Sequence, residues 1–186
     1  MIALDPKTTA LVLIDLQNGI LGRKLAPISA DELIARGKTL AERFRAARAR
    51  VVPVNALPKL DGPERQVDEP FALPRVLPAG FADLAPGLAE PGDILITKST
   101  WGAFFRTDLD SELKSRRVST IVLGGVATHI GVEATARQAW ELGYELVIAC
   151  DAATSLGPEP HEATMRHIFP RIARVTDSAT LAFRAR

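Results

Sequence analysis

The chain has few features of a membrane protein, a secreted protein or a nucleic-acid-binding protein. A single cysteine among 186 residues excludes a disulfide within the chain, so we expect a reducing, cytoplasmic environment. No apolar run reaches the ~18 residues of a membrane-spanning helix, and the first residues lack the basic start and apolar stretch of a signal peptide. The 23 basic and 22 acidic residues nearly cancel, which gives no general attraction to nucleic acid or to a membrane surface.

The composition favours one folded domain of alternating strands and helices. Hydrophobic residues make up 47% of the chain, enough for a sizeable core, and we expect residues 1–186 to form a single domain. Strands are predicted at 9–16, 51–55, 94–97, 119–123, 144–149 and 172–175. Helices are predicted at 30–50 after a capping box at Ser29, at 109–117 after Asp108, at 128–142, at 161–169, and after Asp177. This order predicts an α/β three-layer sandwich of the Rossmann type, with helices on both faces of a mainly parallel six-stranded sheet.

One stretch, at about 56–92, does not fit the alternation. The segment from Pro53 to Pro91 holds eight of the chain's 13 prolines and shows little periodicity. Loops of this length in compact domains are more often functional or interfacial, so a lid or a subunit contact is one interpretation. An irregular surface excursion explains the length equally well, and both interpretations stay open at this point.

Several polar residues follow predicted strands, where the ligand sites of parallel α/β sheets lie. They are Asp15, Asn55, Lys98, Thr128 with His129, and Asp151. A carboxylate such as Asp15, which comes after four apolar residues, is costly to bury unless it is paired or used. Alternatively, Asp15 anchors its own backbone as a cap or loop residue. Lys98 could stabilise a carboxylate or a developing anion, or it could be an exposed lysine beside a strand.

The segment GGVATHIGVEATAR, residues 124–137, resembles the signature of the isochorismatase-like hydrolase superfamily. Amidases of that superfamily have a nucleophilic cysteine where this chain has Gly131, and glycine has no side chain to replace the thiolate. True isochorismatases, which hydrolyse a vinyl ether, share the His-Ile-Gly found here at 129–131. The stretch KSTWGAFF, residues 98–105, also matches the superfamily, and the resemblance covers nearly the whole chain.

The resemblance implies a site built from Asp15, Lys98 and the turn that contains Gly131. It makes Asp15 the general acid or base and Lys98 the catalytic lysine. It also implies a cis peptide between Val126 and Ala127. The backbone N–H groups of about Ile130 and Gly131 are then expected to form an anion site. The implied substrate-binding residues are Trp101, Phe104, Thr128, His129, Ile130 and Asn55, although an aromatic cluster is more often part of a core. No cofactor is implied.

Other kinds of site find less support in the sequence. The nicotinamidase-like metal motif is missing after the second strand, and the spacing of His161 and His167 is not that of a zinc helix, so no metal is predicted. Cys150 could be a displaced nucleophile, but a single cysteine in an apolar strand is more often a packing residue. The cations that could contact an anionic ligand are Arg65, Arg75 and Arg106.

Together these residues favour a hydrolase of a small, carboxylate-bearing molecule. Asp15 would protonate a vinyl ether and water would attack the resulting cation. A general acid needs a raised pKa, which the Lys98 ammonium opposes and burial of Asp15 favours. A water-dependent amidase and a catalytically silent binding protein remain alternatives. The resemblance and the proline-rich stretch also imply a homo-oligomer, a dimer or a tetramer.

Overall fold

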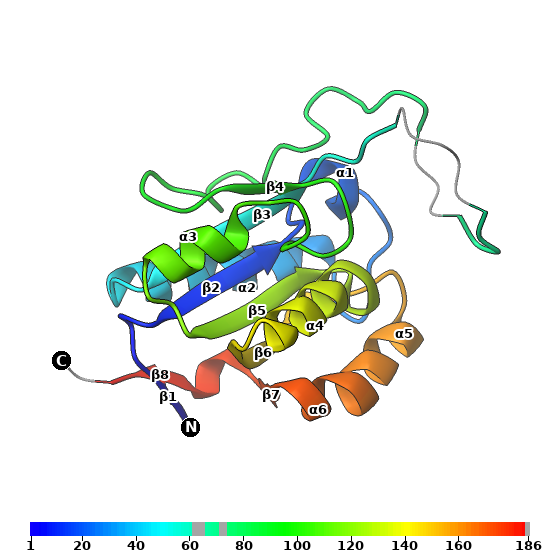
Figure 1. The fold of residues 1–186 in the computed structure, drawn as a ribbon. Coiled ribbons are helices and arrows are strands. Elements are labelled where there is room, and N and C mark those ends of the chain that lie inside the picture. The colour runs from blue at the N-terminus through cyan, green and yellow to red at the C-terminus, as the bar shows by residue number, and fades with distance from the viewer. Residues whose placement is uncertain (61–65, 71–73, 185–186) are drawn as a thin grey trace.

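The computed structural model of the protein describes residues 1–60, 66–70 and 74–184, and its centre is a six-stranded parallel sheet (Figure 1). The strands lie in the order β4-β3-β2-β5-β6-β7, and each neighbouring pair is parallel. Their bounds are Thr9–Ile14 for β2, Arg50–Ala56 for β3, Ile96–Lys98 for β4, Thr120–Val126 for β5, Glu145–Thr154 for β6 and Arg174–Thr176 for β7. This arrangement confirms the predicted fold class.

Strand β2 is central and deeply buried. All six of its residues are buried, and it pairs with β3 on one side and β5 on the other. Its side chains alternate between the faces of the sheet: Val12 and Ile14 join one hydrophobic cluster, and Leu11 and Leu13 join the other. A continuous apolar run therefore fits a strand that is covered on both faces.

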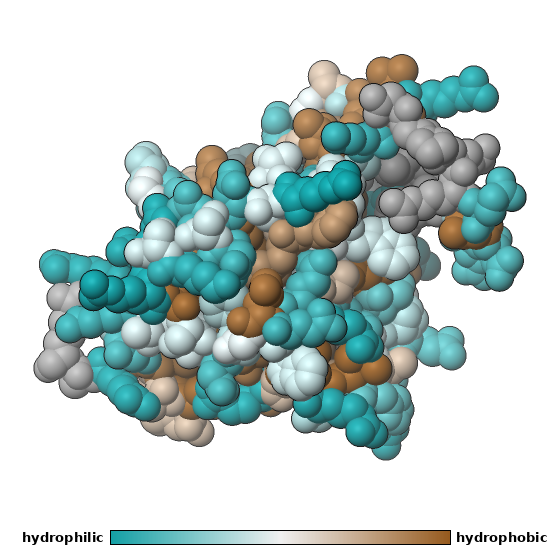
Figure 2. Space-filling model, in the orientation of Figure 1, coloured by the Kyte–Doolittle hydropathy of each residue, from teal (hydrophilic) through white to brown (hydrophobic). Residues whose placement is uncertain are grey.

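Helices cover both faces of this sheet (Figure 1). On one face, α2 (Ala30–Ala46) buries Leu33, Leu40 and Phe44. The other face carries α3 (Leu109–Ser115), α4 (Glu133–Glu141) and α6 (Phe169–Ile172). Figure 2 shows the outer side of α3 and α4 as mainly hydrophilic, with hydrophobic side chains in small separate groups, as expected for amphipathic helices. Among the described residues, no helix is long and apolar enough to cross a membrane.

The short elements complete the connections between strands and helices. They are α1 (Asn18–Leu21), α5 (Pro158–Ala163), the π-helical turns η1 (Thr128–Val132) and η2 (Thr164–Ile168), the 3-10 turn η3 (Ser178–Thr180), and the strands β1 (Ile2–Leu4) and β8 (Leu181–Phe183). The helix predicted at 128–142 therefore begins as η1 and continues as α4, and Gly143 ends it with a φ of 87°.

Of the two predicted helix caps, Ser29 makes a capping hydrogen bond and Asp108 does not. The Ser29 hydroxyl accepts the Glu32 N–H at 3.2 Å, which confirms the cap of α2. Asp108 precedes α3 as predicted, but its side chain makes no capping hydrogen bond.

The prediction of a terminal helix after Asp177 is wrong. One 3-10 turn, η3, is followed by β8, which pairs in parallel with β1 in a separate two-stranded sheet. The physical reason lies in tertiary contacts: the Asp151 carboxylate accepts both the N–H of Ser178 at 2.7 Å and its hydroxyl at 2.6 Å. These bonds hold the start of η3 on β6, and the chain then continues in an extended form.

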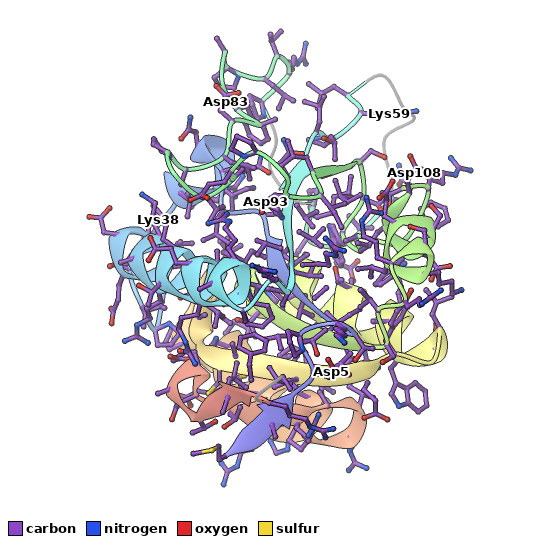
Figure 3. All side chains as sticks on the ribbon, turned by 90° about the vertical axis from the view of Figure 1, so that its left-hand side faces the viewer. Asp5, Lys38, Lys59, Asp83, Asp93 and Asp108 are labelled. Atoms are coloured by element: carbon purple, nitrogen blue, oxygen red, sulfur yellow. The ribbon has the colours of Figure 1, made fainter. Side chains whose placement is uncertain are left out.

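Side-chain amides, including those of Gln17 and Asn55, attach the excursion between β3 and β4 to the body. Gln17, which is fully buried, donates to the carbonyls of Ala56 and Phe81. Asn55 donates to the Ala82 carbonyl at 2.8 Å. Figure 3 shows Lys59 and Asp83 of the excursion at one end of the molecule and Asp5 toward the other. A role for the excursion as a lid or a subunit contact stays a prediction.

Candidate active site

The carboxyl ends of β2, β4 and β5 bring three predicted residues together. Asp15 follows β2, Lys98 ends β4, and Gly131 lies in η1 just after β5. The Lys98 ammonium binds Asp15 Oδ2 at 2.8 Å, and both residues are buried, with 3% and 6% of their surface exposed. A Cβ built on Gly131 would lie 3.3 Å from the same Oδ2. Residues 83 positions apart in the chain thus form one charged pair beside the turn.

The Asp15 carboxyl holds its proton to a higher pH than an ordinary aspartate does. Burial raises its pKa to about 6, and the neighbouring Lys98 ammonium lowers it by a smaller amount. Burial therefore raises the Asp15 pKa by more than the Lys98 ammonium lowers it. Asp15 Oδ1 is buried and has no hydrogen-bond partner among the described residues. This oxygen is the atom from which a proton could be given to, or taken from, a ligand.

The backbone at Asp15 is also unusual. Its φ is 57°, in the left-handed region that few residues other than glycine, asparagine and aspartate adopt. Its N–H donates to the Val54 carbonyl at 2.8 Å, and its own carbonyl accepts the Gln17 N–H at 2.8 Å. These bonds hold Asp15 at the point where the chain leaves the sheet.

The aromatic residues after Lys98 differ in exposure and packing. The Trp101 carbonyl lies 3.5 Å from the Cβ position of Gly131, and the Trp101 side chain is exposed. The Phe104 ring instead packs against the hydrophobic core and lies 5.7 Å from the Tyr144 ring, measured between centroids. The partly buried Phe104 side chain thus packs on the core beside α4, and its contact with a substrate stays a prediction.

The turn after β5 has the expected cis peptide between Val126 and Ala127. The Ile130 N–H, however, donates to the Ala127 carbonyl at 3.0 Å, so the expectation that it faces a ligand is wrong. The turn uses this donor to close its own backbone. For the Gly131 N–H, the role of anion donor stays a prediction.

Two histidines hold this turn, and sequence reasoning assigned only one of them to the site. The Thr128 hydroxyl has one hydrogen, which it donates to the Thr154 carbonyl at 2.9 Å. The 2.8 Å contact between Thr128 Oγ1 and His161 Nδ1 therefore makes Nδ1 the donor and leaves Nε2 without a proton. His129 Nδ1 contacts the Ser155 hydroxyl at 2.5 Å. Burial lowers the pKa of both imidazoles, so both are neutral at physiological pH.

The comparisons with known proteins agree with this geometry. The model of the isochorismatase domain matches residues 9–180. The chain belongs to the isochorismatase family. It is 47% identical to the uncharacterized isochorismatase family protein YecD of Escherichia coli O157:H7, covering 94% of this chain and 95% of YecD. An isochorismatase family protein from Burkholderia thailandensis has a solved structure with a TM-score of 0.90, 38% identity and coverage of 96% of this chain and 95% of that one.

A relative with a named activity is also similar over most of its length. The ureidoacrylate amidohydrolase RutB of Methylobacterium radiotolerans is 34% identical, covering 96% of this chain and 80% of RutB. Isochorismatase-family members are hydrolases, and this chain is a hydrolase of that family.

For the other predicted ligand contacts, a role in substrate binding stays a prediction. The Asn55 side chain is engaged by the Ala82 carbonyl of the excursion. The Arg106 guanidinium stacks on the Phe105 ring at 5.1 Å and lines a hollow of about 530 Å³ beside β4. Arg75 is exposed on the excursion, and Arg65 lies outside the described residues.

Cys150 does not have the properties of a nucleophile. Burial and the nearby Asp177 carboxylate raise the pKa of its thiol to about 11, so little thiolate forms at neutral pH. Its Sγ contacts Asp177 Oδ1 at 3.4 Å, on the β7 side of β6. In the described ranges, no three metal-binding side chains gather in one place.

Proposed function

We propose that the protein hydrolyses a small, carboxylate-bearing molecule with Asp15 as the general acid and base and with water as the nucleophile. The observation that carries this proposal is the buried Asp15 carboxyl, whose pKa is about 6 and whose Oδ1 is unpartnered. A carboxyl whose pKa is raised toward neutral pH suits protonation of an unsaturated carbon or a leaving group. By the family resemblance, Gly131 takes the position of the amidases' cysteine beside Asp15, and a glycine has no thiol with which to form a covalent thioester.

For a vinyl ether the steps balance with these residues alone. Asp15 gives its proton to the terminal alkene carbon, and the positive charge develops on the carbon that carries the ether oxygen. Water adds to that carbon, and its released proton returns to Asp15. The resulting hemiketal collapses to a ketone and an alcohol, so the net reaction adds one water and no covalent enzyme intermediate forms.

Lys98 has a hydrogen left for the substrate. Its ammonium donates to Asp15 Oδ2 at 2.8 Å and to the Thr100 carbonyl at 3.1 Å. An ammonium carries three hydrogens, so one can bind a substrate carboxylate. A bound anion would offset the positive charge of Lys98 and help Asp15 to keep its proton.

A second candidate is water-dependent hydrolysis of a C–N bond, with Asp15 as the base. The similarity to RutB, named as a ureidoacrylate amidohydrolase, favours it. The two candidates share Asp15 and Lys98 but release different products.

The test incubates purified protein with isochorismate and follows pyruvate, and in parallel with ureidoacrylate and follows ammonia. The control is Asp15→Asn, which keeps the shape of the side chain and removes its acid. Pyruvate from the wild type, reduced more than about 100-fold in Asp15→Asn, supports the first candidate. Ammonia without pyruvate supports the second. Equal turnover by wild type and Asp15→Asn would contradict both.

A further inference from the structure

The loop that follows β4, residues 99–105, lies between the Asp15–Lys98 pair and α4. The Lys98 ammonium donates to the Thr100 carbonyl at 3.1 Å. The Trp101 carbonyl lies 3.5 Å from the Cβ position of Gly131. The backbone of the 99–105 loop is therefore in direct contact with the ammonium and close to the turn after β5, and whatever holds the loop also holds Lys98.

Two side chains of α4 hold this loop by its backbone. The Thr135 hydroxyl accepts the Ala103 N–H at 3.1 Å, and Gln138 Oε1 accepts the Phe104 N–H at 3.2 Å. Residues three apart lie on the same side of a helix, so the two acceptors meet two consecutive N–H groups of the loop. Thr135 is almost fully buried, and solvent therefore cannot substitute for its hydroxyl.

The same hydroxyl also reaches the turn beside Asp15. Thr135 Oγ1 donates to the Gly131 carbonyl at 2.7 Å while it accepts the Ala103 N–H. One oxygen thus joins the two backbone segments that flank the Asp15–Lys98 pair. An apolar side chain of equal size would leave the Ala103 N–H without an acceptor.

The fit of the loop on α4 is close on the loop side as well. A Cβ on Gly102 would lie 2.1 Å from Gln138 Oε1, so a side chain at this position would push the Gln138 amide away from the Phe104 N–H. The loop and α4 therefore fit closely here, and residue 102 has no room for a side chain unless the Gln138 amide moves.

We propose that Thr135 is a positioning residue, which keeps the Lys98 ammonium on Asp15 by joining the Gly131 carbonyl to the 99–105 loop. This inference deepens the proposed function, because it names a residue outside the charged pair on which that pair depends. Thr135 touches neither Asp15 nor Lys98 through any hydrogen bond in the described structure, so it acts through the loop.

The test compares Thr135→Val, which removes the hydroxyl, with Thr135→Ser, which retains it. The matched control is Thr164→Val, because Thr164 is also buried and its hydroxyl binds Glu133, away from the loop. The readout is the Asp15 carboxyl titration in the substrate-free protein, followed by infrared difference spectroscopy against Asp15→Asn. Thr135→Val is expected to raise the Asp15 pKa by about one unit, because the ammonium that lowers it is no longer held in place. Thr135→Ser and Thr164→Val are expected to titrate like the wild type.

A second variant covers the case in which Thr135→Val does not fold. Thr135→Ala also removes the hydroxyl, places no apolar methyl groups beside the Ala103 N–H, and should shift the titration in the same direction. An unshifted titration in folded Thr135→Val, or in Thr135→Ala if Thr135→Val does not fold, would overturn the inference. The titration needs no substrate, so a wild type without hydrolytic activity would end the proposed function and leave this test intact.

Discussion

At the scale of single residues, the site depends on the balance between burial of Asp15 and the charge of Lys98. Burial raises the Asp15 pKa to about 6 even though the ammonium is 2.8 Å from Oδ2. Without the ammonium, the carboxyl would hold its proton to a higher pH, but a substrate anion would lose its partner.

Lys98→Met is therefore expected to have two separable effects. The pH at which kcat/KM falls on the alkaline side should become higher, because the Asp15 pKa rises once the positive charge of Lys98 is gone. Activity at its optimum should drop by about 100-fold, because the anion-binding ammonium is lost. The pH–rate profile measures both. Lys114→Met is the control, since that exposed lysine pairs with Asp110 on α3, and a similar profile change in Lys114→Met would contradict the assignment.

His161 gives a prediction about stability. Burial holds its pKa below the ordinary value, so the unfolded chain binds a proton on this residue more readily than the folded protein does. Its contribution is fully present above about pH 6.5 and is lost as the pH falls below that value. Asp15 has the opposite sign: its raised pKa adds stability below the unfolded value of 3.8, which is lost as the pH rises through about 6.

The two contributions can be separated by substitution. His161→Asn keeps a donor for Thr128 and removes the titration, so urea unfolding between pH 7.5 and pH 5.5 should show a smaller loss of stability than in the wild type. The exposed His167→Asn serves as the control and should follow the wild type. Identical losses in His161→Asn and the wild type would show that His161 does not titrate in this range.

At the scale of elements, the Asp151–Ser178 contact fixes the end of the chain. Asp151→Ala removes the acceptor of both the Ser178 N–H and its hydroxyl. We expect this change to lower the free energy of unfolding by about 2 kcal/mol, because two bonds to a carboxylate are lost. Asp108→Ala is the control, since that carboxylate makes no capping bond and its loss should change stability by less than about 0.5 kcal/mol. Equal losses in the two variants would refute the role given to Asp151.

The sequence predicted the elements whose stability is local or periodic. The apolar run of β2 and the cap at Ser29 each depend on a few adjacent residues, so the sequence alone indicates them. The strand β8 has only three residues and depends on β1, which lies at the other end of the chain. No local pattern could distinguish it from the helix that was predicted.

In the site too, some residues could be predicted from the sequence and others depend on contacts with distant parts of the chain. The ends of parallel strands placed Asp15 and Lys98 among the polar residues at one edge of the sheet, and the family resemblance then selected these two as the site. The roles of His161 and Ser155 depend on contacts across 33 and 26 residues, which no spacing in the sequence indicates. The burial of the Phe104 ring likewise depends on its packing with Tyr144, on another element.

At the scale of the whole molecule, Gln17 attaches the excursion to the sheet. Its amide binds both Ala56 and Phe81 from a fully buried position, so the excursion returns to the body beside the start of α1. Because Gln17 is two residues from Asp15, the excursion is fixed close to the proposed site.

Gln17→Leu should loosen the excursion without melting the sheet. Hydrogen exchange of the segment around Phe81 is expected to rise about tenfold or more, while the amides of β2 and β5 stay protected, because the Ala56 and Phe81 carbonyls and the Ala56 N–H lose their partner on Gln17. Asn18→Ala, which removes an exposed bond to the Gly80 carbonyl, should change exchange far less. Unchanged exchange in Gln17→Leu would contradict the anchoring role.

The assembly expected from the family resemblance can be measured directly. Sedimentation equilibrium of the purified chain, 20.0 kDa per subunit, should give a dimer or a tetramer at micromolar concentration. A monomer under these conditions would contradict the expectation.

The most direct test of the central claim is the titration of Asp15 in the wild-type protein. Infrared difference spectra between the wild type and Asp15→Asn, recorded from pH 4 to pH 8, isolate the protonated carboxyl of this residue. The account predicts a carbonyl band that disappears with a midpoint of about 6, which would give Asp15 a proton to donate near neutral pH. A midpoint near 3.8, the ordinary value, would leave Asp15 almost fully ionised above about pH 5 and would contradict its role as the general acid.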